Sequence, residues 1–272
     1  MSVSGTNTGA PLLHDQVRDE TWFKCEGQGE AVVFIHGVGL DHRMWKAQIA
    51  GLKDQFRVIC YDMLGHGQSA HPPRERFLSD FVHQLHQLLI RLKLKHAALI
   101  GFSMGGLVAR DFAILYPEMT SKLILINTVF HRSREQKKAV MARYLSSKTL
   151  GVQKEVDAAI DRWFTPVFVA ANPDVIDSVR SRLLSNDPHA YLKAYKVFAT
   201  ATDPDAPLAI SCPTLVMTGE LDKGSTPQMS KSLANAIDGA KVEILPGLRH
   251  MTPMEGADRV NQLLAAFLDD KE

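Results

Sequence analysis

The strand-to-helix turn at residues 101–105 constrains the fold more than any other part of the sequence. The apolar run 97–100 is typical of a buried strand, and residues 107–115 predict a helix. Between them the chain reads Gly-Phe-Ser-Met-Gly, a full match to the G-x-S-x-G pattern with Ser103 at its centre. Such a turn crowds the backbone, so the residues two before and two after the serine must lack a Cβ. The pattern predicts a strained turn with an exposed Ser103 hydroxyl, which suits a nucleophile better than a structural turn.

Strand-like and helix-like segments alternate along most of the chain. We predict strands at 21–26, 31–35, 56–61, 97–100, 122–127, 214–218 and 241–245, and helices at 44–52, 77–92, 107–115, 227–237 and 253–267. The run 31–35 is apolar throughout, as in strands that are covered on both faces. This alternation implies right-handed crossovers. The predicted fold class is therefore α/β, a mostly parallel, doubly wound sheet with helices on both faces.

The alternation is interrupted once, after Asn127. Residues 131–205 have a helical composition and contain no convincing strand. We therefore predict that residues 1–130 and 206–272 form one α/β core, and that residues 131–205 form a helical cap inserted into it. The length of 272 residues suits one large domain with such an insertion.

Composition excludes several other classes of protein. The formal net charge is +1 and no basic run is present, so nothing indicates nucleic-acid binding. The three cysteines have neither metal-site spacing nor an even disulfide framework, and we predict no metal and no cofactor. Residues 1–15 predict a loose polar tail without the apolar stretch of a signal peptide, and no run is long enough to span a membrane. We expect a cytoplasmic protein that does not contact membranes.

Two residues downstream of the cap can activate Ser103. A serine hydroxyl is a weak nucleophile near neutral pH and needs a general base that a carboxylate orients. In sheets of this kind, functional groups gather after the carboxyl ends of the strands. His250 follows the predicted strand 241–245 and is the candidate base; the alternative is a surface histidine in a glycine-containing loop. Asp222 follows the predicted strand 214–218 and is the candidate acid, with Glu220 as its rival.

Two backbone N–H groups are candidates for an oxyanion hole. Attack on a carbonyl creates a negative oxygen, which preorganised N–H groups stabilise. One donor is Met104, directly after the nucleophile and at the start of a helix whose dipole favours an anion. The other is Val38, in the loop His36-Gly-Val-Gly39 that follows the strand 31–35. We expect His36 to brace this loop through hydrogen bonds rather than to take part in catalysis.

Taken in order, these motifs resemble the serine α/β-hydrolases over nearly the whole chain. The matching segments are His36-Gly37, Asp62-x-x-Gly65-His66-Gly67-x-Ser69, the turn at Ser103, Gly219-x-x-Asp222 and His250. The order serine, aspartate, histidine is the one expected for a catalytic triad of this family. A serine in place of an aspartate nucleophile argues against its haloalkane dehalogenase and epoxide hydrolase branches.

Within the family, the cap is most similar to that of the 3-oxoadipate enol-lactonases and related small carboxylester hydrolases. The similar segments are Arg-Trp-Phe-Thr-Pro at 162–166, Asn172-Pro173, Asn186-Asp-Pro188 and Tyr191. The chain departs from that branch by keeping His36-Gly37 in the oxyanion loop. This difference leaves the particular lactone open, whereas ester-type hydrolysis is still implied.

We assign Gly37, Arg43, Trp163 and Tyr191 to the substrate pocket. Trp163 either lines the pocket or packs the cap onto the core, where large aromatic residues are most often found. Arg43 lies just beyond the oxyanion loop, where it can meet an anionic group or cap the next helix. Residues 131–205 contain twelve Lys and Arg against nine Asp and Glu. This slight excess suits a carboxylate-bearing substrate, although a solvated helical surface explains it equally well.

These assignments predict a cofactor-free serine hydrolase that cleaves a small carboxylic ester or an enol-lactone through an acyl-enzyme. The same triad also serves amide, thioester and carbon–carbon hydrolysis, perhydrolysis and acyl transfer, because specificity depends on the cap and pocket. A third possibility is a small-molecule receptor of the same fold with slow turnover. The predicted partner is a small molecule.

Overall fold

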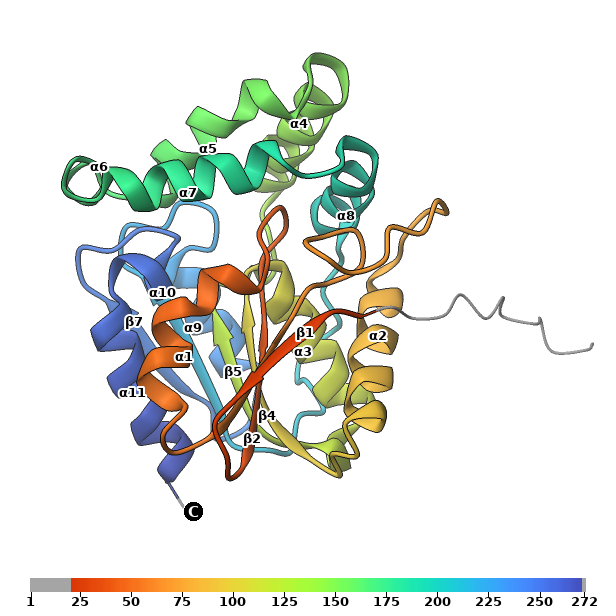
Figure 1. The fold of residues 1–272 in the computed structure, drawn as a ribbon, viewed down its shortest axis with the longest axis vertical. Coiled ribbons are helices and arrows are strands. Elements are labelled where there is room, and N and C mark those ends of the chain that lie inside the picture. Colours follow the sequence, from red (N-terminus) through yellow and green to blue (C-terminus); the bar gives the residue numbers. More distant parts are fainter. Residues whose placement is uncertain (1–20, 271–272) are drawn as a thin grey trace, which may run out of the picture.

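One seven-stranded sheet forms the core of the protein in the computed structural model, which describes residues 21–270. The strands lie in the order β1-β3-β2-β4-β5-β6-β7; β1 is antiparallel to β3, and every other neighbouring pair is parallel (Figure 1). Their bounds are β1 Phe23–Glu26, β2 Ala31–Ile35, β3 Arg57–Tyr61, β4 Ala97–Phe102, β5 Thr120–Ile126, β6 Thr214–Gly219 and β7 Lys241–Leu245. The mostly parallel sheet confirms the predicted fold class. The predicted tail, residues 1–15, lies outside the described residues.

Helices cover both faces of this sheet (Figure 1). One face packs against α1 (Lys46–Leu52) and α11 (Ala257–Asp269), and the other against α2 (Leu78–Arg91), α3 (Met104–Leu115) and α9 (Pro227–Asn235). In β4 the alternate residues Ala98, Ile100 and Phe102 face the first layer, whereas Ala97 and Leu99 face the second. Burial on both faces explains why this strand is an unbroken apolar run in the sequence.

Strand order determines where a site can form. From β2 the chain runs to β3 on one side, and from β3 it crosses to β4 on the other side of β2. The segments that follow β2 and β4 therefore diverge, which opens a crevice at the carboxyl ends of these neighbouring strands. The loop at residues 36–39, named the oxyanion loop for its predicted role, follows β2, and Ser103 follows β4, so the topology places both at this crevice.

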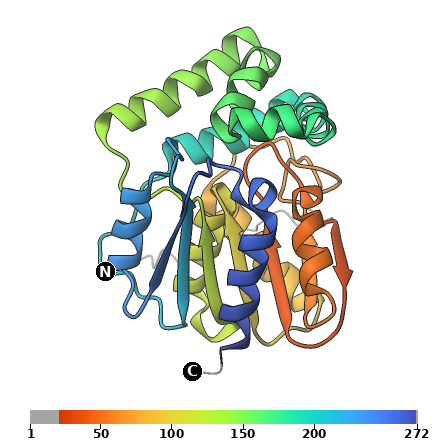
Figure 2. The same cartoon turned by 90° about the vertical axis from the view of Figure 1, so that its left-hand side faces the viewer.

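Five α-helices lie between β5 and β6, where the sequence predicts the insertion. They are α4 (Arg134–Leu150), α5 (Val156–Trp163), α6 (Pro166–Ala171), α7 (Pro173–Leu184) and α8 (Pro188–Thr200), with a short 3-10 helix, η3, at Val152–Glu155. Figure 2 shows them stacked above the carboxyl ends of the strands. We keep residues 131–205 as the proposed cap on this basis.

Helix boundaries differ from the predictions in three places. The predicted helix 44–52 is a 3-10 helix, η1 (His42–Trp45), followed by α1. Helix α3 starts at Met104, three residues earlier than predicted. The last predicted helix is divided at Gly256 into α10 (Thr252–Glu255) and α11. None of the helices in residues 21–270 combines the length and the hydrophobicity that crossing a membrane requires.

Candidate active site

Ser103 occupies the strained turn that its sequence pattern predicts. Its φ of 53° and ψ of −113° lie in a region that L-residues rarely adopt. The flanking glycines are needed for close approach, because a Cβ on Gly101 would meet the backbone oxygen of Gly105, and one on Gly105 would meet that of Ile35. The exposed hydroxyl that we expected is not found: Ser103 is 4% exposed and faces a cavity beneath the cap, because the cap helices cover the turn.

His250 and Asp222 form a buried pair at the same cavity. The Asp222 carboxylate accepts a hydrogen bond from His250 Nδ1 at 2.7 Å, and both residues are less than a tenth exposed. The backbone N–H groups of Gly224 and Ser225 donate to Asp222 Oδ1 at 2.8 and 3.0 Å. Burial alone would raise the pKa of Asp222, but the charge of His250 and the hydrogen bonds from His250, Asn127 and Ser225 outweigh burial and hold it below its usual value. The carboxylate is therefore ionised and orients the imidazole.

Glu220, the rival acid, lies elsewhere. Its carboxylate accepts a hydrogen bond from the Gly247 N–H at 2.9 Å, in the turn that follows β7. Its backbone N–H pairs with the Leu245 carbonyl, which continues the β6–β7 pairing beyond the strands. Glu220 thus closes a surface turn, and Asp222 is the acid that contacts His250.

Asn127 donates a hydrogen bond to Asp222, a role that we did not predict from the sequence. Its side-chain N–H groups donate to Asp222 Oδ2 at 2.8 Å and to Thr218 Oγ1 at 3.1 Å, and its carbonyl accepts from the Thr252 hydroxyl. The residue is fully buried at a φ of 49°, a left-handed conformation that asparagine tolerates better than most residues. Asn127 directly follows β5, the neighbour of the strand β6 that precedes Asp222, and this position could have indicated the contact.

Two buried histidines brace the oxyanion loop. His36 Nε2 accepts from the Met63 N–H at 2.9 Å, and its Nδ1 lies 2.8 Å from the Gly37 carbonyl, which confirms the expected bracing. His66, which we did not assign a role, accepts from the Gly39 N–H at 3.0 Å. Burial lowers the pKa of both imidazoles, that of His66 to about 3. Both rings are neutral at ordinary pH, so each can accept a backbone hydrogen bond.

This bracing holds the loop against the nucleophile. A Cβ placed on Gly37 would lie 3.3 Å from the Ser103 Cβ and 2.9 Å from a Phe102 ring carbon, so only glycine fits between them. Val38 lines the cavity beside Ser103. Met104 is the first residue of α3, where a helix leaves its N–H groups without a partner in the preceding turn. The two candidate oxyanion donors therefore flank the serine.

Arg43 does not line the cavity, although we predicted it as a substrate contact. Asp41 caps the N-terminus of η1 and holds the Arg43 guanidinium through hydrogen bonds of 2.7 to 3.0 Å, leaving that side chain 61% exposed.

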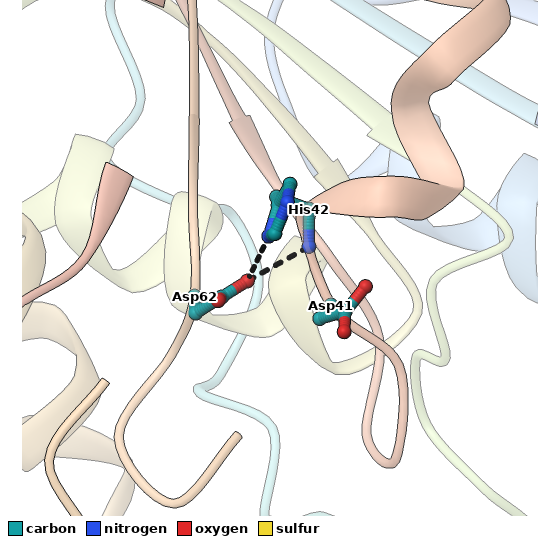
Figure 3. Close-up of side chains that lie close together, drawn as sticks. All are labelled: Asp41, His42 and Asp62. Atoms are coloured by element: carbon teal, nitrogen blue, oxygen red, sulfur yellow. Dashed lines mark hydrogen bonds and ion pairs between the residues drawn. The ribbon is translucent and has the colours of Figure 1, made fainter. Parts of the chain in front are cut away.

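Figure 3 shows the neighbouring pair, in which both the backbone N–H and the ring Nδ1 of His42 bind Asp62 Oδ1 at 2.8 Å. Asp41, His42 and Asp62 lie close enough to share a metal ion, but these partners already occupy both carboxylates, so we assign none.

The structure thus brings most of the predicted residues together. Ser103, Asp222, His250, Gly37, Val38, Trp163 and Tyr191 all line one cavity between core and cap. The Trp163 ring lies 6.2 Å from that of His250, and its carbonyl accepts from the Met251 N–H at 3.0 Å. Trp163 therefore both lines the cavity and ties α5 to the loop after β7. The cap also contributes three arginines that we did not predict there, Arg132, Arg143 and Arg162.

Known proteins resemble this chain over most of its length. A family model described as alpha/beta hydrolase fold matches residues 30–257. The (E)-2-((N-methylformamido)methylene)succinate hydrolase of Acinetobacter baylyi is 31% identical over 248 residues, 90% of this chain and 92% of that protein. The 3-oxoadipate enol-lactonase 2 of the same organism is 29% identical and covers 88% of both chains.

Solved structures are similar to this chain over the same extent. The enol-lactonase from Burkholderia xenovorans superposes with a TM-score of 0.85 at 28% identity, over 92% of this chain and 96% of its own. A thermophilic esterase from Thermogutta terrifontis has a TM-score of 0.83 at 33% identity, over 91% and 92% of the two chains. Both sequence and fold are thus shared over nearly the full length of each.

Proposed function

This chain belongs to the alpha/beta hydrolase fold family, and from that premise we propose that it is a cofactor-free serine hydrolase acting on a small carboxylic ester or enol-lactone. The observation that carries the proposal is the cavity where the strained Ser103 turn meets the His250–Asp222 pair. The names of its relatives, among them lactonases and an esterase, also support a hydrolase. The cytoplasmic location stays a prediction from the sequence.

In the proposed reaction Ser103 Oγ attacks the substrate carbonyl. His250 Nδ1 is bound to the Asp222 carboxylate, so Nε2 remains to take the serine proton and to return it to the leaving oxygen. The N–H groups of Val38 and Met104 bind the oxyanion, and losing one such donor costs on the order of 10² to 10³ in rate. Water that His250 deprotonates then attacks the acyl-enzyme and releases the acid.

Ester-type substrates are favoured over the other bonds that this triad can cleave. The relatives named above include two enol-lactonases and an esterase at 28 to 33% identity, each similar over most of this chain. Two of the curated relatives are named for dicarboxylic compounds, a succinate derivative and a 3-oxoadipate lactone. We therefore propose a small-molecule substrate that bears a carboxylate.

A substrate panel tests this proposal. The purified protein should hydrolyse p-nitrophenyl esters and lactones with steady multiple turnover, and much more slowly the corresponding amides, thioesters and vinylogous 1,5-diketones. Ser103→Ala should lower kcat by roughly 10⁴- to 10⁶-fold. Activity should fall towards acid pH because a protonated His250 cannot accept the serine proton. A rate that Ser103→Ala leaves unchanged would refute the mechanism, and a single turnover would favour the receptor alternative.

A further inference from the structure

Three arginines of the cap line the cavity that contains Ser103. Arg132 directly precedes α4, Arg143 lies within α4, and Arg162 lies near the end of α5. In the part of the chain that the structure describes, no carboxylate lies within ion-pair distance of any of them. Guanidinium groups at a partly desolvated site normally have anionic partners, because burying an unpaired charge is costly. These arginines therefore require an explanation.

Arg132 is the most deeply buried of the three, at 7% exposure. Its Nη1 donates to the Phe198 carbonyl at 2.9 Å, and its guanidinium carbon lies 4.4 Å from the centre of the Phe198 ring. Its Nη2 is buried and has no hydrogen-bond partner within residues 21–270. A buried donor without an acceptor costs about 1 to 3 kcal/mol, more when it is charged. One nitrogen of the Arg132 guanidinium is thus held by the protein, and another has no acceptor among the described residues.

Arg110, a fully buried arginine outside the cavity, has carboxylate partners. Arg110 donates to Asp111 at 2.9 Å and to Asp203 at 2.8 Å, so its charge is balanced by two carboxylates. The second oxygen of Asp203 accepts from the His131 N–H at 2.7 Å. Asp203 attracts Arg132 electrostatically but lies beyond ion-pair distance of it. The fold thus balances the charge of buried Arg110 with carboxylates, whereas Arg132 has no such partner.

The cavity arginines also repel one another. Burial and repulsion by Arg143 together lower the pKa of Arg132 to about 10, although the negative charge of Asp203 partly opposes them. The pKa of Arg162 is lowered by burial and by Arg143 in the same way. Glu155 is the carboxylate of the cap that lines this cavity, and its Oε1 accepts from the Ser146 hydroxyl at 2.6 Å. The cavity thus has an excess of positive charge that an anionic ligand would relieve.

We propose that Arg132, Arg143 and Arg162 form an anion subsite for the carboxylate of a substrate whose scissile carbonyl lies at Ser103. This inference rests on the proposed function and names the substrate class of the same cavity. The planar arginine fork matches a carboxylate, which accepts two parallel hydrogen bonds. The nearby negative charge of Glu155 favours a singly charged carboxylate over a doubly charged phosphate. The substrate is then the half-ester or lactone of a dicarboxylic acid.

Matched esters test the subsite. Monophenyl esters of succinic, glutaric and adipic acid are compared with the same esters in which the free carboxylate is a carboxamide. We expect kcat/KM to be about 10- to 100-fold higher for the carboxylate of the fitting length, because charge-assisted hydrogen bonds are lost in the amide. The ratio should fall as salt is added. A ratio near one for all three chain lengths would overturn the inference while leaving the proposed function intact.

Variants of the three arginines test whether the preference for a carboxylate depends on them. Arg143→Met and Arg162→Met should each move the carboxylate-to-carboxamide ratio towards one, and Arg132→Lys should lower it because the ammonium lacks the bidentate fork. Arg134→Met is the matched control, since Arg134 is an exposed residue of α4 that does not line the cavity, and it should keep the wild-type ratio. A control that changes the ratio as much as Arg143→Met would show a general charge effect and refute the subsite.

Ligand-induced stabilisation separates this inference from the proposed function. Glutarate should raise the melting temperature of the wild type more than glutaramide or inorganic phosphate does, and this shift should be lost in Arg143→Met. If no ester or lactone is hydrolysed but glutarate still stabilises the wild type, the proposed function fails and the anion subsite stands. If phosphate stabilises more than glutarate, the assignment of a carboxylate is wrong.

Discussion

Replacing Ser103 by glycine should give a more stable protein than replacing it by alanine, although both changes remove the nucleophile. Ser103 has φ 53° and ψ −113°, a conformation that glycine adopts freely and that a residue with a Cβ adopts only under strain. The alanine variant keeps that strain, and the glycine variant releases it. The difference in unfolding free energy between the two variants therefore measures the backbone strain at position 103.

The expected difference is small but measurable. A residue held in a sparsely populated region costs about 1 to 3 kcal/mol. Glycine loses about 0.4 to 1 kcal/mol through the greater freedom of the unfolded chain, and removing the buried Cβ costs up to about 0.8 kcal/mol. The net expectation is that the glycine variant has a free energy of unfolding about 1 kcal/mol higher than the alanine variant. For a chain of 272 residues this corresponds to about 2 °C in melting temperature.

Urea unfolding followed by circular dichroism measures both variants without any need for activity. Ser230, a buried serine inside α9, provides the control because its backbone is helical. There the order should reverse, with Ser230→Gly about 1 kcal/mol less stable than Ser230→Ala. If Ser103→Ala is as stable as Ser103→Gly, or if the two sites show the same order, the turn stores no strain and the reasoning is refuted.

Three further predictions concern residues that support the site. The pKa of buried His66 is about 3, below its unfolded value of 6.5, so its contribution to stability is complete above pH 6.5 and is lost as the pH falls towards 3. His66→Gln should therefore flatten the decline in the free energy of unfolding between pH 7 and 5. Urea titration at each pH measures that decline. Asn127→Ala removes a donor to ionised Asp222 and should lower kcat roughly 10- to 100-fold with little change in KM, and steady-state kinetics with an unchanged kcat would contradict this role. Asn186, in the cap, donates to the Gly39 carbonyl at 2.8 Å, and Asn186→Ala should lower kcat by about 2- to 10-fold by loosening the oxyanion loop, whereas an effect confined to KM would assign it to substrate binding.

Much of the site could be predicted because its parts are local. The turn at Ser103 needs two glycines at fixed offsets, and that requirement is written in five consecutive residues. Asp222 and His250 follow strands, and parallel strands bring their carboxyl ends to one edge of the sheet. Strand order within the sheet was not needed for this inference. The alternation of elements was sufficient to place the three residues on the same side.

Contacts between distant elements could not be predicted in this way. Asn127 contacts Asp222 because β5 and β6 are neighbours, which is a property of strand order and not of either segment alone. Arg43 was predicted in the pocket, but Asp41 holds its guanidinium at the start of η1. Each outcome depends on which of several possible partners is nearest in space, and the sequence does not give that distance.

The sequence by itself determined the order of strands and helices along the chain, the position of the insertion, and the residues that could attack and transfer protons. These follow from backbone geometry and from the spacing of apolar residues. The tertiary structure alone decided which charges of the cap line the cavity. Arg132 and Arg134 are two residues apart and count equally in the net charge, yet Arg132 is buried in the cavity wall and Arg134 is exposed. Which side of the cap faces inwards is set by how it packs on the sheet, and that packing brings three arginines to the cavity where we propose an anion subsite.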